Sequence, residues 1–293
     1  MVLRRLKPKQ RSRVGATLTF SVAPIFLTQK GWYALNILAI GDVVGEVGVE
    51  ELEKSLRKIK TEHNVDFTVV NGENSAGVGI TAALAHRIYN AGADVITLGN
   101  HVWGKRDIAK FLEDDGYILR PANLADIAPG RGYGIFQVKS KMICVINLID
   151  RCEMDFGPDN PFTCVTRILK ESERHADFTV VDFHASATSE KIAMAYHLDG
   201  KVSALWGTHT HVQTADERVF QGGLGYITDL GMSGPVNSVL GIRPEQSVRM
   251  FKGDVPVRFE TAPGPCSVCG AVFRLNDNDF KCEEVKRIQF SRG

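Results

Sequence analysis

Short apolar runs alternate with segments of helical periodicity from residue 36 onward, and this alternation limits the fold more than any other feature. Strands that are apolar almost throughout lie in sheets covered on both faces, and the helices between such strands supply the cover. We therefore predict an α/β fold of buried sheets and outer helices. Runs rich in Val, Ile and Leu cover residues 36–42, 66–70, 94–98, 178–183 and 202–206.

The remaining segments extend this pattern. Apolar residues at helical spacing predict helices over residues 48–61, 81–91, 105–115, 161–173, 189–197 and 245–252. Shorter apolar runs predict further strands over residues 117–119, 134–139, 142–148, 226–229, 257–260, 267–275 and 282–290. No internal repeat or low-complexity linker divides these segments, so we expect residues 35–293 to form a single domain.

The first 34 residues differ from the rest of the chain in charge. They carry seven basic and no acidic side chains, whereas residues 35–293 carry 28 basic and 34 acidic ones, a net charge of −6. We expect residues 1–34 to be a basic, disordered extension that does not join the fold, with a signal or transit peptide as the alternative. The mildly acidic remainder lacks the positive charge typical of nucleic-acid-binding domains.

The cysteines and the apolar runs bear on the compartment. The six cysteines are not spaced as a disulfide framework and Cys144 lies in an apolar run, so we expect a reducing, cytoplasmic environment. Cys266 and Cys269 form a lone CxxC pair, which is more typical of incidental thiols than of a zinc site. No apolar run reaches the roughly 20 residues of a spanning helix, so we expect no membrane association.

Polar side chains follow the predicted strands, at the point where open α/β sheets bind their ligands. All are oxygen or imidazole donors and none is a thiolate, a set that suits Mn²⁺, Fe²⁺ or Zn²⁺. They exceed the needs of one tetrahedral ion and match two ions that share a bridging carboxylate. These side chains are Asp42, Glu73, Asn74, Asn100, His101, His184, His209 and His211.

Each of these side chains taken alone has a simpler interpretation. Asp42 could cap a helix or a turn, Glu73 could face solvent, and His184 could be a hydrogen-bonded core histidine. The pair His209 and His211 is harder to dismiss, because side chains two residues apart point the same way on an extended backbone. This pair is therefore the strongest single metal signal in the chain.

Other aromatic side chains fit structural roles. Four further histidines lie within or beside predicted helices rather than at strand ends, and we expect them to lie on the surface or to pack against neighbours; they are His63, His86, His175 and His197. Trp206 ends an apolar run and is predicted to lie in the core.

Taken in order, the polar blocks resemble those of the calcineurin-like metallophosphoesterase superfamily. A narrower resemblance, to the YmdB-like bacterial phosphodiesterases, rests on residues 40–45, 71–79, 182–191, 207–216 and 228–235. It extends over residues 36–290. The superfamily blocks are Gly41-Asp42, Asn71-Gly72-Glu73-Asn74, Gly99-Asn100-His101, His184 and Gly207-Thr208-His209-Thr210-His211.

The resemblance implies a fold, an activity and a cofactor. The fold would be a layered αββα sandwich of mixed sheets flanked by helices, with residues 35–293 as one metallophosphoesterase domain. The activity would be hydrolysis of 2′,3′-cyclic nucleotides and other phosphodiesters by a metal-bridging hydroxide, with a link to RNA turnover. The cofactor would be two divalent ions, Fe or Mn, with Zn or Mg as alternatives. A homo-oligomer is also implied.

The resemblance also implies a role for each site residue. His101 would face the scissile phosphate as the catalytic residue. Apart from the resemblance, Ser75 and Thr210 are candidates to contact the phosphate of a substrate. Two positions depart from the superfamily pattern, because Val44 stands where a histidine is usual and Val102 where an acidic residue often follows Gly-Asn-His. The implied ligands are Asp42, Asn74 and His211 for the first ion, Asn100, His184 and His209 for the second, and Glu73 as the bridge.

Two other functions remain open from the sequence. The same metal core would serve a phosphomonoesterase or an RNA nuclease, since these reactions need the same donors. The chain could also act mainly as a regulatory partner of RNA-processing proteins, with weak catalysis.

Overall fold

The computed structural model describes residues 34–152 and 157–291. The predicted extension of residues 1–34 lies outside this range, apart from Ala34 at the start of the first strand. None of the described helices is long and apolar enough to cross a membrane. No disulfide joins the six cysteines, all of which lie in the described ranges, and Cys144 is buried as expected.

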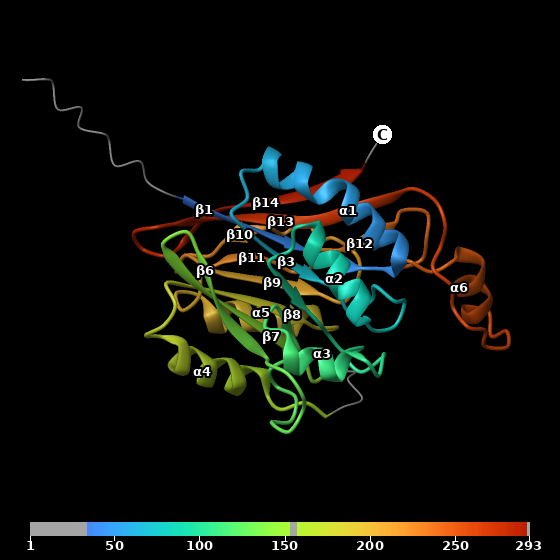
Figure 1. Ribbon diagram of the computed structural model, residues 1–293, viewed down its shortest axis with the longest axis horizontal. Helices are drawn as coiled ribbons and strands as arrows, with labels where there is room; N and C mark the ends of the chain where they lie inside the picture. Colours follow the sequence, from blue (N-terminus) through green and yellow to red (C-terminus); the bar gives the residue numbers. More distant parts are fainter. Residues whose placement is uncertain (1–33, 153–156, 292–293) are drawn as a thin grey trace, which may run out of the picture. The chain divides into compact units, whose positions relative to one another are not determined.

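The described strands form two mixed sheets (Figure 1). In the first sheet β1 runs parallel to β3 and antiparallel to β13. In spatial order it contains β2 (Asp42–Val43), β12 (Met232–Pro235), β13 (Cys266–Asn276), β1 (Ala34–Ile40), β3 (Phe67–Asn71), β4 (Val95–Thr97) and β5 (Ile118–Leu119), with β14 (Cys282–Ser291) paired to β13.

The second sheet has a parallel centre between antiparallel edge strands. Its central strands are buried along most of their length, which explains their near-continuous apolar sequences. In spatial order it contains β10 (Arg218–Val219), β11 (Gly225–Ile227), β9 (Ala204–Thr208), β8 (Phe178–His184), β7 (Lys141–Ile149) and β6 (Tyr133–Val138).

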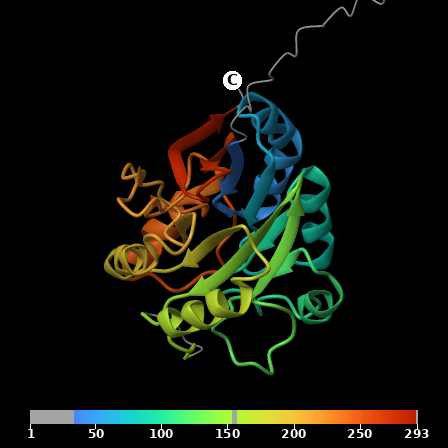
Figure 2. The same cartoon turned by 90° about the vertical axis from the view of Figure 1, so that its left-hand side faces the viewer.

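Helices cover the outer face of each sheet, and Figures 1 and 2 show the resulting layers. Three helices pack on the first sheet: α1 (Gly45–Glu62), α2 (Ala82–Ala91) and α3 (Ile108–Asp114). Two helices pack on the second sheet: α4 (Pro161–Ser172) and α5 (Thr188–Leu198). The predicted αββα sandwich is therefore confirmed. A sixth described helix, α6 (Pro244–Phe251), follows β12 in the chain.

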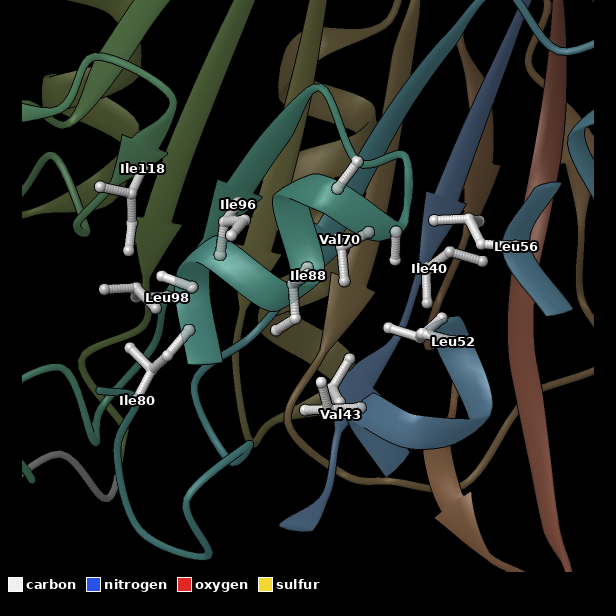
Figure 3. Packing of buried hydrophobic residues seen from close by; sticks show 14 of the residues in the cluster. Ile40, Val43, Leu52, Leu56, Val70, Ile80, Ile88, Ile96, Leu98 and Ile118 are labelled. Carbon is white, nitrogen blue, oxygen red and sulfur yellow. The ribbon is translucent and has the colours of Figure 1, made fainter. Parts of the chain in front are cut away.

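Alternation of side chains along the strands supplies apolar groups to both faces of each sheet. On the outer face of the first sheet, Leu52 and Leu56 of α1 lie toward Ile40, as Figure 3 shows. Between the sheets, Trp206 of β9 packs against Phe273 of β13 with ring centroids 5.4 Å apart. Trp206 is 1% exposed, so its predicted place in the core is confirmed.

Helix boundaries follow local capping chemistry. The Thr81 side chain accepts a hydrogen bond from the Leu84 amide at the start of α2, and Asn160 caps α4 in the same way just before Pro161. Gly92 ends α2 with a φ of 123°, a conformation that glycine adopts without steric cost.

Some sequence-based assignments are wrong. Residues 257–260 form no strand: they lie in an exposed segment where Val257 and Phe259 are 43% and 42% exposed, and no neighbouring strand pairs with them. The first helix begins at Gly45 rather than residue 48. The short strands β2, β10 and β12 were not predicted, because two to four residues carry too little periodicity.

The core between the sheets gives a stability prediction. Phe273→Ala should lower the free energy of unfolding by about 3–5 kcal/mol, because it leaves a cavity beside Trp206 that neighbouring side chains cannot fill. Phe251→Ala, at a side chain that is 79% exposed, should change it by less than about 0.5 kcal/mol. Urea denaturation measures both, and equal losses would contradict this assignment of the core.

Candidate metal centre

The predicted donor side chains gather where the carboxyl ends of strands from both sheets meet. The parallel strands β3 and β4 of the first sheet and β8 and β9 of the second bring their following loops to this edge, and β2 adds the aspartate. The first sheet supplies Asp42, Glu73, Asn74, Asn100 and His101, and the second supplies His184, His209 and His211.

One group of donors surrounds the His184 imidazole. Its Nε2 atom lies 3.2 Å from Glu73 Oε1, 3.0 Å from Asn100 Oδ1 and 3.0 Å from His209 Nδ1. One ligand atom each from Glu73, His184 and His209 lie within 4.8 Å of one another, close enough to hold a single metal ion. Glu73 and His184 are fully buried, and His209 is partly buried.

A second group lies on the other side of Glu73. The Nε2 atom of His211 lies 3.8 Å from Asp42 Oδ1 and 3.1 Å from Asn74 Nδ2. Asn74 Nδ2 also lies 3.1 Å from Glu73 Oε1, so the Glu73 carboxylate stands between the two groups. Val44, where the superfamily usually has a histidine, is buried and apolar, and Asn74 provides the polar side chain beside His211 instead.

The electrostatics of this cluster favour a cation. Asp42 Oδ1 is buried and has no hydrogen-bond partner among the described residues, although an uncompensated buried carboxylate oxygen is costly. Burial raises the pKa of Asp42. Burial would also raise the pKa of Glu73, but the His184 and His101 imidazoles outweigh it and hold that pKa well below its usual range. Carboxylate, amide and imidazole donors around an unpartnered oxygen fit hard or borderline divalent ions.

The pKa values of the two histidines of this group shift in opposite directions. Burial lowers the pKa of His184, but the Glu73 and Asp42 carboxylates overcome it and raise that pKa to about 9. Burial and the adjacent His184 lower the pKa of His209 to about 3. Positive charge is therefore favoured on the His184 imidazole beside the two carboxylates, the place where a bound cation would also be stabilised.

Hydrogen bonds orient the imidazoles toward these points. Thr208 Oγ1 donates a hydrogen bond to Asp182 Oδ1 at 2.8 Å and lies 2.9 Å from His184 Nδ1. The Thr208 oxygen therefore accepts the Nδ1 proton of His184, and the Nε2 atom of His184 points toward Glu73 and Asn100. The Nδ1–H group of His211 faces the Leu240 carbonyl at 3.1 Å, which leaves Nε2 toward Asp42. Such outer contacts fix the tautomer of metal-binding histidines.

The backbone of the histidine loop is not extended, so the expectation that both side chains point the same way from an extended strand is wrong. His209 and His211 have φ values of 95° and 64°, in the region that non-glycine residues seldom occupy. Strand β9 ends at Thr208, and the His209 amide turns to donate to Asp42 Oδ2 at 3.0 Å. The two imidazoles consequently serve different groups, His209 beside His184 and His211 beside Asp42.

His101 lies at the outer side of the cluster with its side chain 38% exposed. Its backbone amide donates to Glu73 Oε2 at 3.1 Å, and its Nδ1 atom lies 2.9 Å from Asn74 Oδ1. These contacts orient the ring, a task that the superfamily pattern associates with an acidic residue at the position of Val102, which is buried here. The ring can therefore meet a molecule that enters from solvent.

The two predicted substrate-binding residues occupy different environments. Ser75 is fully buried, and its Oγ atom has no hydrogen-bond partner within the described part of the chain. Thr210 is half-buried, and its amide donates to Asp229 Oδ2 at 3.1 Å. Their contact with a substrate stays a prediction.

The four remaining histidines contribute no ligand atom to the cluster. His86 packs against Phe111 with ring centroids 5.0 Å apart, and His197 packs against Phe162 at 5.5 Å. His63 is half-buried and His175 is exposed.

Sequence analysis gave no role to four buried polar side chains around the site: Asp182, Lys191, Thr208 and Asp229. Asp182 and Thr208 hold His184, as described above, and Lys191 pairs with Asp229 beneath the histidine loop. A charged residue inside an otherwise apolar strand, as at Asp182, is the signal that could have identified the first of them.

Two facing mixed sheets with carboxylate, amide and imidazole donors at one shared edge define the metallophosphoesterase class of α/β proteins. Within it, the model of the YmdB-like protein family matches residues 38–288. The chain therefore belongs to the YmdB-like family.

Relatives of this chain agree with that membership. It is 41% identical over 257 residues to the 2′,3′-cyclic-nucleotide 2′-phosphodiesterase of Bacillus subtilis, a match that covers 87% of this chain and 96% of the relative. The solved structure of a phosphatase from Mycoplasma pneumoniae is 32% identical with a TM-score of 0.83, covering 89% of this chain and 94% of that one. A hypothetical protein of Thermus thermophilus is 31% identical with a TM-score of 0.82, covering 88% and 100%.

The separation of the two histidines predicts separable metal losses. His209→Ala and His211→Ala should each lower metal content by about one ion per chain, because each removes one imidazole from a different group. Elemental analysis of protein loaded with Mn²⁺ measures this, and circular dichroism should show an intact fold. His197→Ala, remote from the cluster, is the matched control. Loss of both ions from either variant, or of neither, would contradict the separation.

Proposed function

We propose that this chain is a phosphodiesterase that uses two divalent metal ions to hydrolyse 2′,3′-cyclic nucleotides. The observation that carries the proposal is the Glu73 carboxylate, which stands between a His184–His209 group and an Asn74–His211 group. A carboxylate shared by two sets of donors is the arrangement that binuclear hydrolytic sites use. The named activity of the 41% identical Bacillus subtilis relative supports the substrate class.

The donor atoms divide between two ions in this proposal, and Fe or Mn suits them best. Asp42 and His211 would hold the first ion together with Asn74, whose amide would turn to present its oxygen. Asn100, His184 and His209 would hold the second, and Glu73 would contact both. When bound, two divalent ions acidify water and neutralise the charge of phosphate oxygens.

The remaining chemistry belongs to side chains of the protein. His101 lies at the solvent side of the cluster, where its imidazole can deliver a proton to the leaving oxygen. Hydrolysis would break the bond between phosphorus and the 2′ oxygen, add the hydroxyl of one water to phosphorus and place one proton on the leaving oxygen. Glu73 holds His101 in place for that transfer, because it accepts a hydrogen bond from the His101 backbone amide and its Oε1 atom lies 3.3 Å from the ring nitrogen Nδ1.

A substrate panel tests the proposed function. Purified protein with Mn²⁺ should hydrolyse 2′,3′-cyclic AMP and bis-p-nitrophenyl phosphate, and Glu73→Gln should abolish both activities because it removes the shared charge. Glu53→Gln, which alters only a surface pair with Arg87, should keep them. Intact substrates after incubation with the unaltered protein would refute the proposal. A mainly regulatory protein would keep its cellular effect as the Glu73→Gln variant, whereas a hydrolytic role would lose it.

His101 gives a separate kinetic prediction. His101→Gln should lower kcat by roughly 10²- to 10⁴-fold, the usual contribution of a positioned proton donor. Metal content should not change, because the His101 ring lies outside the His184 and His211 groups. His86→Gln, whose ring contacts Tyr117 at the surface, is the control. A full metal complement with parent-like kcat would exclude His101 as the proton donor.

A further inference from the structure

Lys191 and Asp229 form a buried ion pair beneath the loop that carries His209. The Lys191 Nζ atom lies 2.7 Å from Asp229 Oδ2, and both side chains are 1% exposed. Lys191 comes from α5, on the outer face of the second sheet, and Asp229 follows β11. The absence of a side chain at Gly207 leaves room for the lysine, since a Cβ there would lie 2.8 Å from Lys191 Cδ.

The pair holds the peptide groups on both sides of His209. Lys191 Nζ donates to the Thr208 carbonyl oxygen at 2.8 Å, which belongs to the peptide before His209. Asp229 Oδ2 accepts a hydrogen bond from the Thr210 amide at 3.1 Å, which belongs to the peptide after it. The His209 amide itself donates to Asp42 at 3.0 Å. Three backbone polar groups in the two peptides that flank His209 are thus bonded to acidic or basic side chains.

These hydrogen bonds hold a residue that has an unfavourable backbone conformation. His209 has a φ of 95°, and a non-glycine residue persists there only when its surroundings determine the backbone. Replacing a buried ion pair by neutral groups of similar size is often neutral for stability. Stability alone therefore does not account for a lysine and an aspartate at this place.

We propose that Lys191 and Asp229 are positioning residues that hold His209 in its strained conformation and so aim its Nδ1 atom at Glu73 and His184. The inference rests on the proposed function, because it assigns the pair to the ion that His209 serves. Neither side chain touches that ion or the substrate. They act through the two peptide groups that flank His209.

Three variants and one control test this role. Lys191→Met and Asp229→Asn each break the pair, and the double variant replaces it by a neutral pair of similar size. Lys60→Met is the matched control, because Lys60 also donates to a backbone carbonyl, that of Gly92 at 2.7 Å, and pairs with Asp94 at 3.4 Å. Lys60 lies at the amino ends of the parallel strands, away from the carboxyl ends that carry the metal-binding side chains. Mn²⁺ titration by calorimetry, thermal midpoints and amide hydrogen exchange are measured on each protein.

The expected result separates positioning from stability. Both single variants should bind one Mn²⁺ ion roughly 10- to 100-fold more weakly than the parent, because loss of a contact that orients a metal ligand usually has this effect. They should bind the other ion as tightly as the parent does. The double variant should regain the thermal midpoint but not the lost affinity. Lys60→Met should bind both ions normally. Parent-like affinity for both ions in the single variants, or affinity restored with stability in the double variant, would overturn the proposal.

Hydrogen exchange separates this inference from the proposed function. In metal-free protein the Thr210 amide should exchange faster in Lys191→Met and in the double variant than in the parent, because the loop is no longer held. If the parent binds no Mn²⁺, the proposed function fails, and exchange alone then decides whether the pair holds the loop. Unchanged exchange at Thr210 would refute the positioning role.

Discussion

Two carboxyl groups without exposure to solvent, those of Asp42 and Glu73, are the constraint on which the rest of the structure depends. A buried carboxylate is tolerated only where positive charge or hydrogen-bond donors compensate it. The first sheet carries both carboxyls, whereas the second carries His184 and the loop with His209. Compensation therefore requires the carboxyl ends of the two sheets to meet, and the apolar layer around Trp206 and Phe273 holds them together.

The loop after β9 shows how far the fold is adapted to this requirement. If the strand continued beyond Thr208, the side chains of both histidines would point to the same face, but His209 and His211 adopt positive φ values instead. Their imidazoles thereby reach different sides of Glu73. The conformation is unfavourable in isolation. The loop keeps it by donating hydrogen bonds to Asp42 and Asp229 and by accepting one from Lys191. Local strain and the separation of the two donor groups thus have a common origin.

Most elements and the eight donor side chains could be predicted from the sequence, because long apolar periods and polar residues at strand ends are local signals. The buried side chains that hold these donors, Asp182, Lys191, Thr208 and Asp229, gave no such signal. The short strands β2 and β12 could not be predicted from the sequence, since they form by pairing with strands that are distant in the chain. The backbone of His209 was predicted wrongly for the same reason: Lys191 and Asp229, which hold it, lie 18 residues before it and 20 after. Val257 and Phe259, which alternate with charged residues, resemble a strand in the sequence, but both are exposed and no neighbouring strand pairs with this segment.

Anomalous diffraction from crystals grown with Mn²⁺ would show whether the two sheets jointly hold two ions on opposite sides of Glu73. We expect two anomalous peaks, one within coordinating distance of His184 and His209 and the other within coordinating distance of Asp42 and His211, with Glu73 contacting both. A single peak, or peaks bound by side chains outside this set, would contradict it.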